Sequence, residues 1–154
     1  MESHSLVGRT LESVMIYPMG EIHAAWVNED TLPINTWCVF LFFAGSETIQ
    51  IEACEIKIPD QYPALGLSIN EFTNASTTCK GMSGKSIEAV SVKESEAILP
   101  GMVTKVTESD PLGEDVTTQY TLEIDESSEI WIRHTMPPMM IGLFISDELS
   151  HDNS

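Results

Sequence analysis

The hydrophobic and polar positions of this chain alternate in short runs, a pattern typical of β-strands. The longest apolar run, residues 37–44, is strongly aromatic and too short for a typical helix. It predicts a central strand with both faces covered. Residues 10–17 are rich in apolar and β-branched side chains and stop at Pro18. No long window keeps a helical period with caps, so the pattern predicts an all-β fold.

The same order of segments occurs twice in the sequence. Residues 8–16 match residues 84–92 at an offset of 76, with three identities and five close substitutions in nine pairs. The offset returns where residues 65–69 match residues 141–145. A repeat of this kind predicts two copies of one structural unit.

We expect two five-stranded units that share a core, because a unit of roughly 60 residues is marginal alone. The first unit is expected at residues 6–69 and the second at residues 84–145, with a linker at 70–83. Residues 1–5 and 146–154 are polar and are expected to be flexible tails of one compact domain.

Each unit is expected to contribute five strands in the same order. In the first unit they are residues 10–17, 21–27, 37–43, 48–58 and 65–69. In the second unit they are residues 87–92, 101–107, 117–124, 129–134 and 141–145. A change in the phase of apolar positions within residues 48–58 predicts a bulge near Cys54.

In both units two apolar residues lie three positions apart, Leu11 and Val14 in the first and Ile87 and Val90 in the second. Residues three apart face opposite sides of a regular strand, so the spacing predicts a local bulge or a strongly twisted strand. The alternative is an α+β fold with one short helix per unit, because residues three apart share a helix face.

The charge of the chain is strongly one-sided. The 154 residues include 24 Asp and Glu against 7 Lys and Arg, a formal net charge of −17. Hydrophobic residues make up 42%, so the chain has enough apolar material to fold. Such a charge repels nucleic acid and anionic membranes and attracts basic proteins. We therefore expect a basic protein partner, with no nucleic-acid partner and no membrane partner.

Eight of the acids stand between Val106 and Ile132, where no Lys or Arg occurs. The residues predicted to bind the partner are Glu108, Asp110, Glu114, Asp115, Asp125, Glu126 and Trp131. Glu114 and Asp115 fall where the second unit is longer than the first, so we expect them at a loop tip that tolerates substitution. That the charge only keeps the protein soluble stays an open interpretation.

The aromatic residues divide into two groups. Trp131 stands between Ile130 and Ile132, so it lies on the outer face of its strand if the isoleucines face the core. The other Trp and Tyr residues are expected in the core or on sheet faces: Trp26, Trp37, Tyr17, Tyr62 and Tyr120.

The sequence has no clear motif of an enzyme. Gly84-Lys85-Ser86 ends like a phosphate-binding loop, but Cys79 stands where that loop requires a glycine. The four histidines have no second ligand at metal-binding spacing, and no nucleophile motif occurs. Arg133, an isolated cation among acids, is expected to form a structural ion pair. We therefore expect no catalytic residue, no cofactor and no metal.

The compartment is expected to be the cytoplasm. The first residues lack the basic and apolar regions of a signal peptide. The three cysteines, Cys38, Cys54 and Cys79, form no CxxC motif and no even-numbered disulfide framework.

These features favour a small acidic binding protein. The function expected is an immunity or antitoxin-type inhibitor, or an escort, of a basic protein. One alternative is a structural or adaptor domain that assembles through edge strands or Trp131. The other is an enzyme whose site is assembled from scattered residues.

Overall fold

The computed structural model describes residues 2–17, 34–45, 47–72, 78–80, 86–135 and 140–149. Its main element is a 10-stranded sheet, and a separate 2-stranded sheet lies beside it. The described helices are the short 3₁₀ segments η1 (Ser3–Leu6) and η3 (Lys93–Ala97), and no described helix reaches seven residues. The all-β prediction is therefore confirmed, and the α+β alternative is not.

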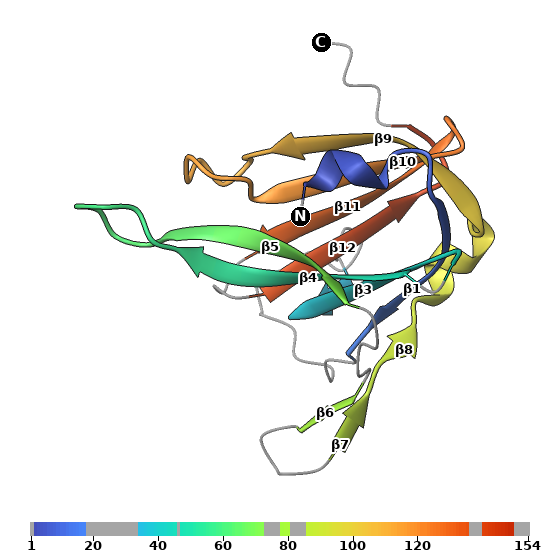
Figure 1. The fold of residues 1–154 in the computed structure, drawn as a ribbon, viewed down its shortest axis with the longest axis horizontal. Helices are drawn as coiled ribbons and strands as arrows, with labels where there is room; N and C mark the ends of the chain where they lie inside the picture. The colour runs from blue at the N-terminus through green and yellow to red at the C-terminus, as the bar shows by residue number, and fades with distance from the viewer. Residues whose placement is uncertain are drawn as a thin grey trace, which may run out of the picture.

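The strand positions follow the alternation of the sequence closely. In chain order they are β1 (Thr10–Ile16), β2 (Ile34–Thr36), β3 (Cys38–Phe43), β4 (Glu47–Ile56), β5 (Ala64–Phe72), β6 (Thr78–Lys80), β7 (Ser86–Glu88), β8 (Val90–Ser91), β9 (Gly101–Ser109), β10 (Gln119–Ile124), β11 (Ser128–Thr135) and β12 (Met140–Ser146). The large sheet has the order β2-β12-β11-β10-β9-β1-β3-β4-β5, and β8 pairs with β1 (Figure 1). The small sheet, β6 and β7, projects from the body of the molecule.

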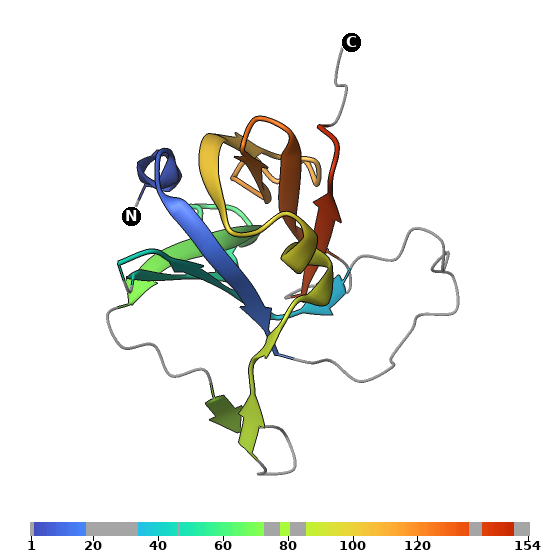
Figure 2. The ribbon, with the colours of Figure 1, turned by 90° about the vertical axis from the view of Figure 1, so that its right-hand side faces the viewer.

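The large sheet folds over on itself so that its two halves face each other, as Figure 2 shows. One half is the meander β1-β3-β4-β5, and the other is the meander β9-β10-β11-β12 with β2 at its edge. At one corner β1 and β9 share two residue pairs, Thr10 with Met102 and Leu11 with Gly101. At another corner the chain passes from β2 into β3 through Trp37.

One hydrophobic core lies between the two halves. Leu41 of β3 and Ile49 of β4 are fully buried in it, together with Leu122 of β10 and Ile132 of β11. A second, smaller cluster around Phe40 covers the other face of β3. Both predictions about the core, that the halves share it and that the central strand is covered on both faces, are therefore confirmed.

The structure does not show the duplication. Residues 10–16 form one strand, but their expected counterparts at 86–92 break into β7 and β8, which pair with β6 and β1. In the second half, β9 takes the place in the meander that β1 has in the first. The two halves share only the meander of four strands. Gly84 and the strand expected at 21–27 lie outside the described residues.

The bulge expected near Cys54 is wrong, because β4 and β5 keep an unbroken register from Thr48 to Ile56. The phase of the apolar positions changes there for another reason. A Cβ added to Gly66, which pairs with Cys54, would meet side-chain atoms of both Ile56 and Val116. The end of the β4–β5 hairpin is therefore covered on a second face by the loop that carries Val116.

A bulge does occur in β1. Its pairing with β3 shifts between Leu11 and Ser13. The shift returns Val14 to the face of Leu11, and both side chains are fully buried. The bulge predicted from the spacing of these two residues is confirmed.

Two segments expected to be loose are partly regular structure. The linker expected at 70–83 includes the end of β5 and all of β6. The tail expected at 1–5 includes most of η1, which lies beside β9 at the open side of the two layers (Figures 1 and 2). Leu6 at the end of η1 is fully buried in the main core. An apolar residue at the edge of a polar tail orders that tail when the core has a gap to receive it.

We predict that Leu6→Ala lowers the free energy of unfolding by about 2–5 kcal/mol, because it leaves a cavity in the core. The neighbouring Val7 is 45% exposed, so Val7→Ala is the matched control and should change stability by less than about 0.5 kcal/mol. Urea unfolding of the three proteins measures both. Equal midpoints for Leu6→Ala and wild type would show that η1 does not close the core.

Candidate interaction surface

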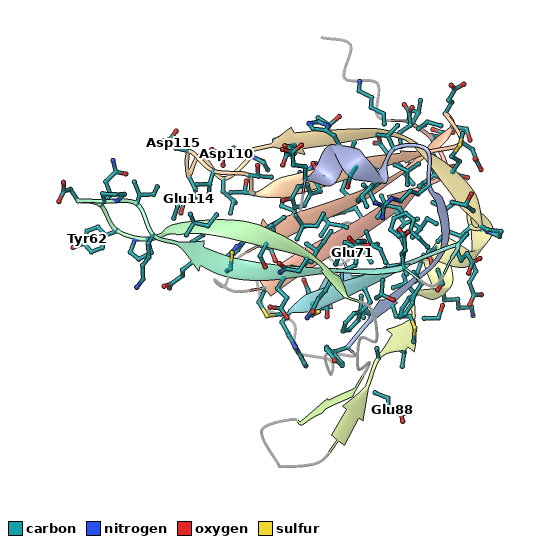
Figure 3. All side chains as sticks on the ribbon, in the orientation of Figure 1. Tyr62, Glu71, Glu88, Asp110, Glu114 and Asp115 are labelled. Carbon is teal, nitrogen blue, oxygen red and sulfur yellow. The ribbon has the colours of Figure 1, made fainter. Side chains whose placement is uncertain are left out.

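Two loops distant in sequence lie side by side at one end of the molecule. Residues 57–63 connect β4 to β5, and residues 110–118 connect β9 to β10 (Figures 1 and 3). The amide of Leu65 donates a hydrogen bond of 2.9 Å to Oε1 of Glu114, which joins the loops. We call the surface formed by residues 57–63 and 110–118 the acidic tip.

Two further contacts hold the first part of β5, one on each side of the Gly66–Leu67 peptide group. The amide of Leu67 donates to the carbonyl of Thr117 over 3.2 Å. Nδ1 of His134 lies 2.8 Å from the carbonyl oxygen of Gly66. Because a carbonyl oxygen only accepts, the Nδ1 atom carries the proton in this contact. His134 is fully buried, and its contact joins β11 in the second half of the sheet to β5 in the first.

The 110–118 loop is organised by one carboxylate. Asp110 accepts hydrogen bonds from the amide of Glu114 at 2.9 Å, the amide of Asp115 at 2.8 Å and the hydroxyl of Thr118 at 3.0 Å. These bonds, that from the Glu114 amide first, lower the pKa of Asp110. Gly113 and Asp115 adopt positive φ angles of 74° and 62° to complete the turn. Asp110 therefore has a structural role.

The 57–63 loop is stiffened by a tight turn. The amide of Gln61 donates to the carbonyl of Ile58 over 3.2 Å, Pro59 follows Ile58, and Asp60 has a φ of 62°. A proline followed by a residue with positive φ is the signature of a type II turn. The turn fixes the backbone of Asp60, and Tyr62 follows the turn by one residue.

Tyr62 is 95% exposed, which means that almost nothing in the described structure packs on its ring. The expectation that it lies in the core or on a sheet face is wrong. Figure 3 shows the residue at the end of the projecting hairpin, with Asp110, Glu114 and Asp115 on the neighbouring loop. The sequence did carry a sign of this position, because Tyr62 stands within a turn bounded by Pro59 and Pro63.

A hollow of ≈380 Å³ lies at the same hairpin end. Its lining residues are Lys57, Ile58, Pro59, Gln61 and Pro63. The two prolines and the isoleucine make it partly apolar. Across both loops Lys57 is the single Lys or Arg, against four acids: Asp60, Asp110, Glu114 and Asp115. The acidic tip thus combines negative charge, an exposed aromatic ring and a small apolar hollow.

Two side chains beneath the acidic tip, Tyr120 and Cys54, have raised pKa values. Burial raises the pKa of Tyr120 to about 12, and the charges of Glu108 and Cys54 add to the effect. Burial likewise raises the pKa of the Cys54 thiol. A thiol is nucleophilic as the thiolate, so the environment of Cys54 disfavours the reactive form. The interior next to the acidic tip is densely packed and supports its two loops.

The predicted partner-binding carboxylates do not form one patch. Asp110, Glu114 and Asp115 gather in the acidic tip, and Glu108 stands beside it at the end of β9, opposite Tyr120.

The remaining two, Asp125 and Glu126, lie at the other end of the six-residue strand β10. At about 3.4 Å per residue the separation is roughly 20 Å. The carboxylate of Asp125 also has a partner within the protein, because its Oδ1 accepts a hydrogen bond of 2.9 Å from the amide of Met102.

Trp131 lies on the outer face of β11, as predicted, since Ile130 and Ile132 are fully buried. Its Nε1 donates to Oε1 of Glu129 over 2.8 Å. Its ring lies 6.0 Å from that of Phe144, between centroids. The side chain of Trp131 therefore already contacts Glu129 and Phe144 of the same molecule.

The contacts of the Arg133 side chain differ from those predicted from the sequence. Nε of Arg133 donates to Oε1 of Gln119 over 2.6 Å. Its guanidinium carbon lies 5.6 Å from the ring centroid of Trp131 and 5.7 Å from that of Phe144. These contacts are cation–π interactions and a hydrogen bond to an amide, and among the residues that the structure describes they stand in place of the expected ion pair. Burial lowers the pKa of the guanidinium.

No protein-family model, curated protein or solved structure matches this chain. Among the residues that the structure describes, no three His, Cys, Asp or Glu side chains are placed to hold a metal ion. In the same described ranges, no helix has the length and apolar character to cross a membrane. The geometry of the acidic tip is therefore the main guide to function.

The first prediction for this surface compares the stability effects of substituting Glu114 and Asp115. From the sequence, both were expected at a loop tip that tolerates substitution. Glu114→Ala removes the acceptor of the Leu65 amide and should cost about 1–2 kcal/mol of unfolding free energy. Asp115→Asn keeps a side chain suited to positive φ and should cost almost nothing. Thermal unfolding of both variants measures the difference. Equal stabilities would show that the Glu114 contact does not hold the loop.

The second prediction concerns alkaline stability. Because the folded state raises the pKa of Tyr120 to about 12, its contribution is fully present below the unfolded value near 10. It is lost as the pH rises from about 10 to about 12, by at most about 3 kcal/mol. Tyr120→Phe should flatten this loss, and Tyr62→Phe should leave it unchanged. Unfolding free energy against pH is the measurement, and identical profiles for wild type and Tyr120→Phe would contradict it.

Proposed function

We propose that this chain is a small acidic binding protein that engages a basic protein through the acidic tip. It acts as an inhibitor or escort of the immunity or antitoxin type. The observation that carries the proposal is that two adjoining loops present the exposed residues Asp60, Asp115 and Tyr62, the last of which is 95% exposed. Aromatic side chains of this kind are enriched at the centres of protein interfaces.

The frame of the acidic tip supports a binding role. Its loops are joined through Glu114 and ordered by Asp110, so little conformational freedom remains to be lost when a partner binds. A preorganised surface binds more tightly because association then costs less ordering entropy.

The charge of the chain supports a basic partner. A net charge of −17 gives long-range attraction to a cationic surface and raises the rate of encounter. The described ion pair of Arg9 with Glu47 lies away from the acidic tip, at the start of β1 and β4. The carboxylates of Asp60 and Asp115 are on exposed residues and face solvent.

As part of this proposal the protein acts in the cytoplasm. Cys54 is a free thiol and is partly exposed. Unpaired cysteines are usual in a reducing compartment. No catalytic role is proposed for Cys54, because burial raises the pKa of its thiol.

The test compares association rates with the basic protein retained by the immobilised chain from the cells that produce it. Asp60→Asn/Asp115→Asn removes two charges from the acidic tip, and asparagine tolerates the positive φ of both positions. Glu126→Gln/Asp147→Asn removes two charges at the opposite end and is the matched control.

We expect the tip variant to associate several-fold more slowly at low salt, with the difference shrinking as the ionic strength rises. The control variant should associate at a rate close to that of wild type. Equal slowing by both variants would mean that the charge acts only as a diffuse field. Equal rates for all three proteins would contradict the proposal.

A further inference from the structure

We infer that the outer face of β10, β11 and β12 binds the carboxylate of a small organic acid, and that Arg133 supplies the counter-charge. The sequence predicts an ion pair for Arg133, yet among the described residues no carboxylate pairs with its guanidinium. The ligand supplies the missing anion. The site uses no residue of the acidic tip, so it is independent of the proposed function.

Neutral side chains hold the guanidinium of Arg133 in one orientation. Its Nε donates a hydrogen bond of 2.6 Å to Oε1 of Gln119, and Nε2 of Gln119 donates one of 2.9 Å to the hydroxyl of Thr121. Its guanidinium carbon lies 5.6 Å from the ring centroid of Trp131 and 5.7 Å from that of Phe144. Because Nε has a partner, Nη1 and Nη2 are the donors left for a ligand, and within the described ranges neither has an acceptor.

The carboxylates on the same face of the sheet have other partners. Glu129 shares the face of Arg133 by alternation along β11, and Glu123 lies opposite Glu129 on β10. Glu129 accepts a hydrogen bond from Nε1 of Trp131, which stands between Glu129 and Arg133 along the strand. Glu123 accepts one from the hydroxyl of Thr104. Burial lowers the pKa of Arg133, and an anion bound at the guanidinium would offset this cost of desolvation.

Asn35 adds a second donor in the same row of side chains. Arg133 of β11 pairs with Gly142 of β12, and Gly142 pairs with Asn35 of β2. Paired residues point to the same face, so the guanidinium and the Asn35 amide stand on either side of a residue without a side chain. The Cα atoms of Arg133 and Asn35 are about 10 Å apart, two strand spacings. In the part of the chain that the structure describes, the Asn35 side chain has no hydrogen-bond partner.

The surroundings of Arg133 favour a monocarboxylate with an apolar body. The planar fork of a guanidinium matches the two oxygens of a carboxylate. One cation balances one negative charge, whereas a phosphate dianion brings a second charge to a chain of net charge −17. The rings of Trp131 and Phe144 are partly exposed and supply apolar surface for the rest of the ligand.

The test follows the NMR resonances of the Trp131 indole N–H and the Arg133 Nε–H while phenylacetate is added to the full chain. Phenylacetate carries one carboxylate on an aromatic body. We expect saturable shifts of both resonances, with a Kd of roughly 1 mM or below. The neutral analogue 2-phenylethanol and the dianion phenyl phosphate should each bind at least about 10-fold more weakly.

Variants of the two cations on this face provide the second arm. Arg133→Gln should abolish the saturable shift of the Trp131 indole, and Arg133→Lys should weaken binding about 10-fold, because lysine keeps the charge and loses the planar fork. Lys105→Gln is the matched control, since Lys105 is exposed and its pairing with Glu123 places it on the same face. This control should bind phenylacetate like wild type. Circular dichroism checks that each variant is folded.

Four results would overturn the inference. They are the absence of a saturable shift with phenylacetate, equal binding of 2-phenylethanol, tighter binding of phenyl phosphate, and equal loss of binding in Arg133→Gln and Lys105→Gln. None of them changes the expected effect of substituting Asp60 and Asp115, so failure here leaves the proposed function standing.

Discussion

The backbone amides at the edge of β5 need hydrogen-bond partners, and the arrangement of the molecule depends on which residues supply them. An unpaired strand edge is a site for aggregation unless another part of the chain covers it. Here the 110–118 loop supplies partners for the amides of Leu65 and Leu67, and His134 contacts the carbonyl oxygen of Gly66 on the other side of the same peptide group. The same contacts close the two halves of the sheet over the core and bring two loops together as the acidic tip.

The closure explains why the carboxylates of this region have unequal roles. Asp110 orders its own loop, and Glu114 ties that loop to the edge of β5. Asp115 and Asp60 have exposed positions on backbone with positive φ. A high net charge works against the compact state by self-repulsion. Carboxylates with an internal partner offset this cost, and those without such a partner are available for a contact.

Strand positions were predictable because period-two alternation is a local property. Residues 101–107 and 141–145, for example, match the central parts of β9 and β12. The shared core followed from size and composition. The bulge in β1 followed from the spacing of Leu11 and Val14, which no regular strand accommodates on one face.

Properties that depend on which strands and loops lie next to each other were not predictable from the sequence. The likeness of residues 8–16 to residues 84–92 does not produce the same strand twice, because β9 takes the meander position instead. The phase change at Cys54 was misread because its cause, Val116, comes from a distant loop. The exposure of Tyr62 likewise depends on where the 110–118 loop lies, and the six acids fall into two groups because β10 separates them.

The central claim is that the acidic tip is a preorganised surface built on the closed edge of β5. Amide hydrogen exchange of Leu65 and Leu67 in the free protein tests it most directly, with Ile49 and Ile51 in the core of β4 as references. If the edge is closed as described, the two β5 amides exchange nearly as slowly as the references, through opening of the whole domain. Fast exchange at Leu65 and Leu67, with slow exchange at Ile49 and Ile51, would contradict the account.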